Sequence, residues 1–144
     1  ELHALIAGLD QYDIVVGTRF HPNSTYNVKG PRRWAMRLLS RTLSKMAKSP
    51  ITDPTSGFRS AGTRAIHLFH RNYPAEYLGD TVGSLAIAIR TGLTVGETPV
   101  TMYYREVGRP SKNAVWSTLY LGRASLALLV NALKRTAPRR EEEA

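Results

Sequence analysis

The sequence predicts an α/β fold, because a segment with helical spacing is followed at once by a segment typical of a buried strand. Apolar residues recur at helical intervals over residues 1–9, and residues 13–18 form the β-branched run Asp-Ile-Val-Val-Gly-Thr. A long two-faced helical pattern follows over residues 31–48. The chain has 144 residues, which is enough for one domain with its own core.

Residues 21–30 separate the predicted strand from the long helix. This segment is polar and rich in helix breakers, which predicts an exposed loop. The residues concerned are Pro22, Asn23, Ser24, Asn27 and Gly30. Because proline suits the first position of a helix, we expect the helix to begin at Pro31, and Pro50 ends the pattern.

Two kinds of side chain divide the helix at residues 31–48 along its length. At about 100° per residue, the basic residues gather on one side and the apolar residues on the other. The basic residues are Arg33, Arg37, Arg41, Lys45 and Lys48, and the apolar residues are Ala35, Met36, Leu39, Leu43, Met46 and Ala47. A basic stripe is by default the solvated face of a helix. However, Trp34 flanks this stripe, and a basic face with an aromatic edge also suits the headgroup zone of a membrane.

The second half of the chain predicts two further helices and a strand. Residues 63–71 predict a short helix, and Asp80 is expected to cap another that runs to about Thr91, before Gly92. Residues 93–104 predict a strand, in which Pro99 indicates an edge position or a bulge. Residues 105–113 form a polar loop in this interpretation.

Residues 114–133 are the most apolar segment of the chain. The segment approaches the roughly 20 residues of a transmembrane helix, but Arg123 lies near its middle, where a charge is costly. We therefore expect residues 114–136 to form an amphipathic helix at a membrane interface. The alternative is a core helix that covers a sheet. Residues 137–144 are expected to form a charged tail.

The composition restricts the partners and the chemistry. Lys and Arg total 20 against 11 Asp and Glu, which gives a net charge of +9. A basic surface favours polyanions, namely nucleic acid, anionic lipid or phosphorylated substrates. The absence of cysteine excludes disulfides and thiolate metal sites. The chain begins at Glu1 within a predicted helix, without an initiator methionine or a signal peptide, so we expect a fragment of a longer protein.

The segment Asp53-Pro-Thr-Ser-Gly-Phe-Arg59 combines more chemistry than most structural loops need. Gly57 permits a tight bend or the close approach of a ligand, and the proline keeps Asp53 out of the helical region. Arg59 has a planar fork that can hold a phosphate, with Thr55 and Ser56 as further donors. The alternative is a type I turn that carries a surface arginine.

Five segments in a fixed order connect the chain to a known family. They are Asp13-Ile-Val-Val-Gly-Thr-Arg-Phe20, the basic helix, the Asp53–Arg59 segment, Gly92-Leu-Thr-Val-Gly-Glu-Thr-Pro-Val100 and Arg105-Glu-Val-Gly-Arg-Pro-Ser-Lys112. Over residues 1–113 the chain resembles the C-terminal half of a family 2 glycosyltransferase. The polyprenol-phosphate (dolichol-phosphate) mannosyltransferases and their bacterial relatives are the most similar group. Any one segment is weak evidence, whereas the ordered set is specific.

The resemblance implies a partial GT-A fold, the α/β fold of nucleotide-diphospho-sugar transferases, without its N-terminal nucleotide-binding half. It implies transfer of a sugar from a nucleotide sugar to an acceptor such as polyprenol phosphate, with inversion. It also implies Mg²⁺ or Mn²⁺ as a cofactor, with ligands outside this chain. The implied location is peripheral, at the cytoplasmic face of a membrane. This location is compatible with a membrane-protein partner. Without the other half, we expect the isolated chain to be inactive and its sheet to expose an edge.

The resemblance also assigns site residues. The acceptor-binding residues that it implies are Arg19, Arg33, Thr55, Ser56, Gly57 and Arg59, and those of the donor-diphosphate loop are Arg105, Gly108, Ser111 and Lys112. Asp53 is the implied catalytic residue, which either orders the acceptor loop or contacts the reacting groups. Relatives usually carry an acid at the position of Gly83, for which Asp80 is a weak substitute, and whether Gly83 abolishes that acidic site residue stays open.

Three other interpretations remain open. His67 and His70 are spaced for a shared metal, but without a third ligand we expect surface or packing histidines and no metal site. Nucleic-acid binding would explain the +9 charge, but few aromatic residues interleave with the basic ones, so we expect no nucleic-acid partner. The third is a non-catalytic remnant that binds lipid phosphate or a membrane partner.

Overall fold

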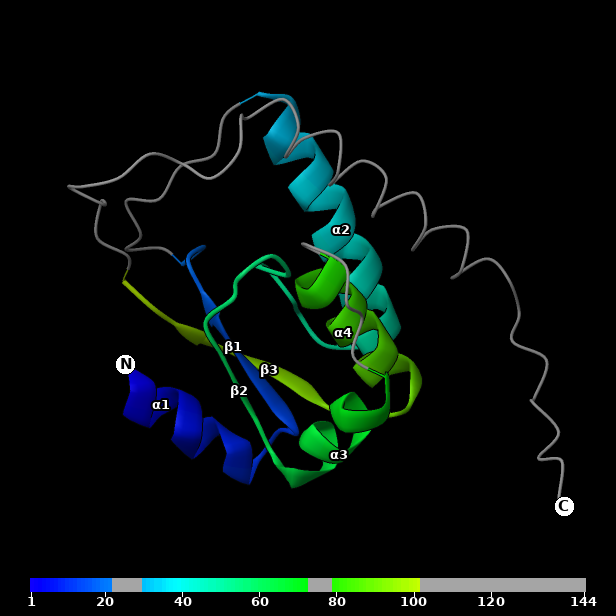
Figure 1. Ribbon diagram of the computed structural model, residues 1–144. Helices are drawn as coiled ribbons and strands as arrows, with labels where there is room; N and C mark the ends of the chain where they lie inside the picture. Colours follow the sequence, from blue (N-terminus) through cyan, green and yellow to red (C-terminus); the bar gives the residue numbers. More distant parts are fainter. Residues whose placement is uncertain (22–29, 73–78, 102–144) are drawn as a thin grey trace, which may run out of the picture.

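The computed structural model describes residues 1–21, 30–72 and 79–101 (Figure 1). Its elements are α1 (Leu2–Ala7), the 3-10 turn η1 (Gly8–Asp10), β1 (Ile14–Thr18), α2 (Pro31–Ala47), β2 (Arg59–Ala61), α3 (Thr63–Asn72), α4 (Gly79–Arg90) and β3 (Val95–Pro99). The expected α/β class is therefore confirmed. The predicted loop at 105–113, helix at 114–136 and tail at 137–144 lie outside the described residues, as do residues 22–29 of the first predicted loop.

β1 is the central strand of a three-stranded mixed sheet of order β2-β1-β3. It pairs antiparallel with β2, with Val16 opposite Arg59, and parallel with β3, with Thr18 opposite Pro99. Every residue of β1 is buried, as its β-branched run predicts. In the part of the chain that the structure describes, β3 is an outer strand, so the edge position predicted for Pro99 is confirmed.

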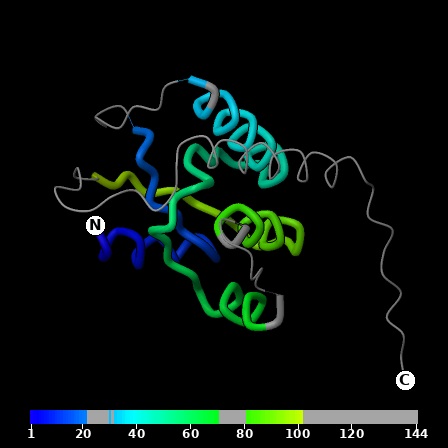
Figure 2. The backbone as a smooth tube through the Cα atoms, turned by 45° about the horizontal axis from the view of Figure 1, so that its top comes forward, coloured from blue at the N-terminus to red at the C-terminus, as the bar shows by residue number. Residues whose placement is uncertain are grey.

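Helices cover both faces of the sheet, with α1 on one face and α2, α3 and α4 on the other (Figures 1 and 2). Successive side chains of a strand point to opposite faces. Val16 therefore packs in the larger apolar cluster, with Leu39 of α2 and Leu85 of α4. Val15 packs in the smaller cluster, with Leu5 of α1. The two clusters hold β1 firmly between two helical layers.

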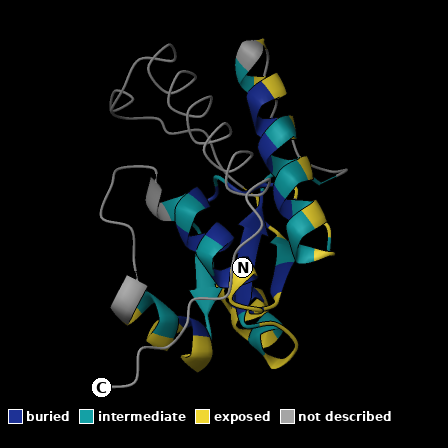
Figure 3. Ribbon diagram, turned by 90° about the vertical axis from the view of Figure 1, so that its right-hand side faces the viewer, coloured by how far each residue is buried: buried dark blue, intermediate teal, exposed yellow. Residues whose placement is uncertain are grey.

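The long helix α2 has the two faces that its sequence predicts. Figure 3 shows buried residues on the side of α2 that faces the sheet and exposed residues on its outer side. The five predicted basic residues are all exposed, whereas Met36, Leu39 and Leu43 are buried. The helix ends where Lys48 adopts a left-handed conformation with φ of 54°. The apolar side of α2 thus fixes its rotation relative to the sheet.

The ends of α4 agree only in part with expectation. The helix begins at Gly79, so Asp80 is its second residue and not the cap that the sequence suggests. Its C-terminal end matches the prediction, because Gly92 has φ of 82°. The Gly92 N–H donates to the Ile89 carbonyl at 3.1 Å and the Leu93 N–H to that of Ala88 at 2.9 Å, the pair of bonds that closes a Schellman motif.

The strand β2 was not expected from the sequence. It contains only Arg59–Ala61, too few residues to show an alternating pattern, and exists because it pairs with β1. The predicted helix that follows is confirmed as α3. Since β2 continues directly from the Asp53–Arg59 segment, its pairing fixes one end of that loop against the sheet.

Gly17 in β1 lets the same loop approach closely. Its N–H donates to the Phe58 carbonyl at 2.8 Å. A Cβ atom here would lie 2.9 Å from Val100 Cγ1, a distance that real Cβ atoms essentially never show, and 3.1 Å from the Phe58 oxygen, which is tighter than most. Glycine is therefore strongly favoured where Phe58 pairs with β1.

Candidate functional site

The candidate site lies at the carboxyl ends of the parallel strands β1 and β3. The loop 51–58 crosses this end of the sheet, between α2 and β2. In open α/β sheets, ligands bind outside the carboxyl ends of the strands. Here Arg19 follows β1 directly, Asp53 lies in the loop, and Glu97, in the middle of β3, reaches the loop with its side chain.

Arg19 and Asp53 form a two-pronged ion pair. Arg19 Nε donates to Asp53 Oδ2 at 2.6 Å and Nη2 to Oδ1 at 2.7 Å. The Arg19 backbone N–H also donates to Oδ2, at 3.1 Å. The Asp53 side chain is 0% exposed and that of Arg19 is 13% exposed. Such a fork fixes both the position and the plane of the guanidinium group.

Thr55 and Ser56 stabilise the loop around this pair. Thr55 Oγ1 accepts from Arg19 Nη2 at 2.9 Å and donates to Asp53 Oδ1 at 3.2 Å. The Ser56 N–H donates to the Asp53 carbonyl at 3.2 Å, which closes a turn. Ser56 is buried, and its hydroxyl accepts from the Phe58 N–H at 3.3 Å. The predicted turn is thus present, and its hydroxyl groups hold the turn itself together.

Glu97 is the second carboxylate of the site, and its sequence context predicts no role for it. It accepts from the N–H and the hydroxyl of Thr52, each at 2.7 Å, and from the Asp53 N–H at 2.9 Å. Because the Thr52 hydroxyl donates to Glu97, the Thr18 hydroxyl is the donor in the 2.7 Å contact between Thr18 and Thr52. Glu97 therefore ties the start of the loop to β3 and, through Thr52, to β1.

Arg59 braces the other end of the loop. Its guanidinium group donates to the carbonyls of Ser56 at 2.6 Å, Pro54 at 2.9 Å and Thr81 at 2.6 Å. It also donates to the Ser84 hydroxyl at 3.3 Å. Thr81 and Ser84 belong to α4, so Arg59 joins the loop to that helix. It is half-buried, unlike the surface arginine of the simple turn; its contact with an acceptor stays a prediction.

The loop is also fixed to α2. Ser40 Oγ donates to the Ile51 carbonyl at 2.6 Å, and the Ile51 N–H donates to Ser44 Oγ at 2.8 Å. With these bonds the loop is attached to α2, β1, β3 and α4. A loop held in this way keeps one shape before a ligand arrives, which reduces the cost of binding.

Gly57 is the open point of the loop. It is exposed, and a Cβ atom added there would have no heavy atom within 4 Å. Its backbone is not left-handed, because the positive-φ glycines of the described residues are Gly30 and Gly92. A bend that needs a left-handed residue is therefore absent at Gly57. There is space beside Gly57 for a ligand to approach the backbone closely, so this other predicted use of the glycine remains a prediction.

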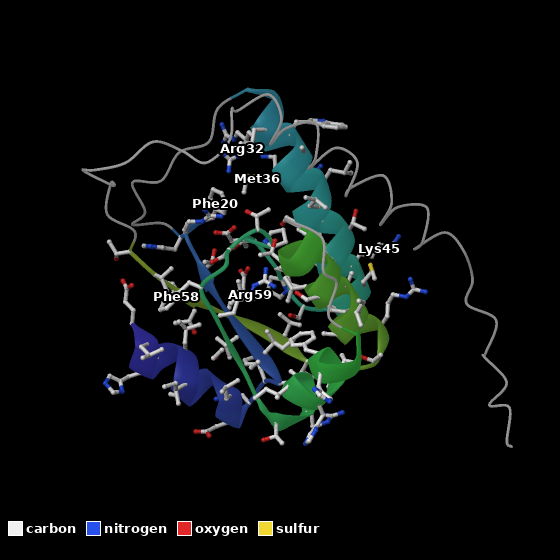
Figure 4. The ribbon with its side chains drawn as sticks, viewed as in Figure 1. Phe20, Arg32, Met36, Lys45, Phe58 and Arg59 are labelled. Atoms are coloured by element: carbon white, nitrogen blue, oxygen red, sulfur yellow. The ribbon has the colours of Figure 1, made fainter. Side chains whose placement is uncertain are left out.

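Two neighbouring arginines at the start of α2 lie in different surroundings. Arg33 is exposed on the outer side, whereas Arg32 is half-buried, one helical turn before the buried Met36. Figure 4 shows Arg32 on the side where Phe20 lies, at the end of β1. Phe20 packs against the core cluster that contains Met36. Of the two arginines, Arg32 is therefore the more buried one, and contact of Arg33 with an acceptor stays a prediction.

Arg32 carries an unsatisfied polar atom. Its Nε is buried and has no hydrogen-bond partner among the described residues. A buried donor without an acceptor is costly unless a ligand or a water supplies one. The inward position of Arg32 could have been predicted from the sequence. Arg32 precedes Met36 by four residues and so shares the apolar face of α2.

The remaining predicted residues are not brought into the site by the described structure. Arg105, Gly108, Ser111 and Lys112 lie outside the described residues. Gly83 lies within α4. His67 and His70 are both exposed on α3, as expected of surface histidines.

The described residues do not fit a divalent metal site. In residues 1–21, 30–72 and 79–101, no three His, Asp or Glu side chains gather as metal ligands. Asp53 and Glu97 are both engaged in hydrogen bonds with the loop and with Arg19. We therefore assign no metal ligand to this part of the chain.

A third carboxylate, Asp13, lies at the opposite end of the sheet. Its Oδ2 accepts from the Thr94 N–H at 2.8 Å and the Thr94 hydroxyl at 2.9 Å, and Arg64 Nη1 lies 3.1 Å from Oδ1. The N–H bond from Thr94 is the main reason that the pKa of Asp13 falls below its ordinary 3.8. The Thr94 hydroxyl and Arg64 lower this pKa further, against an opposing effect of burial.

Comparisons with known proteins leave the function to be argued from the site itself. The chain matches no known family model and no curated protein. Within the described residues, no helix combines the length and the apolar character needed to cross a membrane.

Proposed function

We propose that this chain forms the acceptor side of a family 2 glycosyltransferase with a GT-A fold. The reaction is transfer of a sugar, with inversion, from a nucleotide sugar to a lipid phosphate such as polyprenol phosphate, at the cytoplasmic face of a membrane. One observation carries the proposal. Three of the segments that suggest the family, around Arg19, Asp53 and Glu97, are far apart in sequence and meet at the carboxyl end of the sheet.

The charges of this site suit a phosphate acceptor. Arg19 is held by Asp53 in a fixed orientation, and Arg32 offers a buried Nε without a partner among the described residues. A phosphate has several acceptor oxygens, so one such group can bind Arg32 while Arg19 supports it electrostatically. The exposed backbone at Gly57 leaves room for an attached chain or sugar.

The carboxylates of the site also agree with this reaction. A lipid phosphate is already a nucleophile, so it needs positioning and charge neutralisation more than it needs a general base. Asp53 and Glu97 both act on the shape of the loop. Of the two roles that the resemblance left open for Asp53, its contacts favour ordering of the loop. Its direct contact with reacting groups stays a prediction.

The first experiment measures binding of farnesyl phosphate, a short polyprenyl phosphate, to the full chain by calorimetry. Arg32→Met retains most of the apolar stem but removes the donors, so we expect affinity to fall at least about tenfold, the value of one hydrogen bond to a charged group. Arg90→Met, at an exposed arginine of α4, is the matched control and should bind as the unchanged protein does. Equal affinity for farnesol, which lacks the phosphate, would refute the proposal.

A non-catalytic lipid-phosphate binder is the second candidate. It is favoured by the engagement of both site carboxylates in structural hydrogen bonds. The two candidates differ in the donor. A transferase consumes a nucleotide sugar in the presence of farnesyl phosphate when the natural full-length protein is used, whereas a simple binder consumes none under the same conditions.

A further inference from the structure

The outer face of α2 is a continuous basic surface with an aromatic residue inside it. With about 100° per residue, the five basic residues fall within a sector of about 120°, and Trp34 falls in the same sector. This surface, the outer face of α2, consists of Arg33, Trp34, Arg37, Arg41, Lys45 and Lys48. All six residues are exposed, so none of them is used to hold the helix against the sheet.

The charges on this face lower the stability of α2. Arg33, Arg37, Arg41 and Lys45 follow one another at intervals of four, so each repels the next along the helix. Arg33 also lies in the first turn, where the helix dipole favours acids, and α2 contains no acid at all. An anionic partner along this face would relieve both effects.

Trp34 indicates which anionic partner fits. Its residue surface is 70% exposed, the largest fraction among the exposed large apolar residues of the described chain. A tryptophan ring surrounded by cations is typical of the boundary between lipid headgroups and acyl chains. There the apolar body of the ring contacts the acyl chains while its N–H remains hydrated. A surface that binds single-stranded nucleic acid interleaves several aromatic rings with its cations, whereas this face has one.

We propose that the outer face of α2 docks on an anionic lipid surface. The apolar face of α2 is committed to the core, through Leu39 and Leu43, so the helix adsorbs by its charges and inserts only Trp34. Trp34 lies in the first turn of α2, the end that also carries Arg32. Docking therefore brings the candidate site close to the headgroups. The proposal does not rest on the glycosyltransferase assignment, because adsorption needs no transfer.

Fluorescence of Trp34 provides the direct test. The chain has two tryptophans, so Trp116→Phe in the full chain leaves Trp34 as the one reporter. Vesicles of equal parts phosphatidylcholine and phosphatidylglycerol should shift its emission to the blue and protect it from acrylamide. Vesicles of phosphatidylcholine alone should do neither, and high salt should reverse the effect, because attraction between exposed charges is screened.

Variants then assign the binding to this face. Each basic residue near an anionic surface accounts for about a fivefold change in affinity, so Arg37→Gln combined with Arg41→Gln should weaken vesicle binding on the order of 20-fold. Arg90→Gln removes an exposed charge from another helix and should change it less than about twofold. Trp34→Ala should weaken binding while leaving its salt dependence unchanged.

Three results would overturn the proposal. The first is an unchanged Trp34 emission with anionic vesicles, including the case in which duplex DNA is bound instead. The second is an equal loss of vesicle binding for Arg90→Gln and Arg41→Gln, which would assign the effect to net charge. The third is an emission already blue-shifted without vesicles, which would mean that another surface covers this face.

Discussion

The two ends of the sheet use carboxylates for different purposes. At the amino end, Asp13 joins the start of β1 to Thr94, next to β3, and pairs with Arg64, whose side chain is 69% exposed. At the carboxyl end, Asp53 is fully buried and, with Glu97, holds a loop instead of a strand. The first arrangement fastens segments that the sheet already brings together. The second gives one fixed shape to a segment that has no regular structure.

The difference favours the carboxyl end of the sheet as the candidate ligand site. A buried ion pair is a poor way to gain stability, because apolar residues of similar size often do as well or better. At Arg19 and Asp53 the pair holds a cationic group in one orientation, which is what the proposed ligand site requires. The amino end needs no such explanation, since an exposed pair adds little in either direction.

Removal of Asp53 should have the largest effect. In Asp53→Ala the mostly buried Arg19 loses its counterion, and the Thr55 hydroxyl loses its carboxylate acceptor. The free energy of unfolding should therefore fall by about 3 kcal/mol. Urea denaturation followed by circular dichroism measures the change. The double variant Arg19→Met with Asp53→Leu should recover much of the stability without recovering farnesyl phosphate binding. Full recovery of binding would contradict a role for this pair at the site.

Glu97→Ala should have the next largest effect. Three donors from Thr52 and Asp53 lose their acceptor, but Thr52 is exposed and water can replace part of the loss. We expect unfolding to become easier by about 1–2 kcal/mol and hydrogen exchange to accelerate in residues 51–58. Unchanged exchange in this loop would show that Glu97 does not hold it.

Asp13→Asn should change how the stability of the protein depends on pH. Because the pKa of Asp13 is lowered in the folded protein, its contribution is present above the ordinary value of 3.8 and is lost as pH falls through the lower folded value. The variant should therefore be less stable by about 1 kcal/mol near neutral pH, and the difference should close below about pH 4. Urea midpoints for both proteins across this range provide the measurement. A difference that persists in acid would contradict the assignment.

Gly57→Ala should have the smallest effect on stability. The new methyl group meets no heavy atom within 4 Å and the backbone conformation is not left-handed, so the change should stay within about 0.5 kcal/mol. Gly17→Ala is the contrasting variant, since its methyl group would collide with Val100 and Phe58, at a cost of about 1–3 kcal/mol. Thermal unfolding of the two variants in parallel distinguishes them. Equal losses of stability in the two variants would contradict the open surroundings of Gly57.

Much of the fold could be predicted because its signals are local. The β-branched run of β1 and the period of α2 each lie within one segment, and burial enforces both. The role of Glu97 could not be predicted in this way, since it depends on the parallel pairing that sets Glu97 opposite Val16. Arg32 had a periodic signal, but its charge suggested solvent. Only the packing of α2 on the sheet shows that it faces inward.

The central position of β1 also determines how the protein can fold. Neither partner of β1 is a close neighbour in sequence, because Ile14 pairs with Ala61 on one side and with Val95 on the other. Strand pairings between distant segments form slowly, since a long stretch of chain must first be closed into a loop. During synthesis β1 leaves the ribosome before β2 and β3, so both of its edges are paired only after residue 99 has emerged. We therefore expect this strand to be the segment on which chaperones act during synthesis.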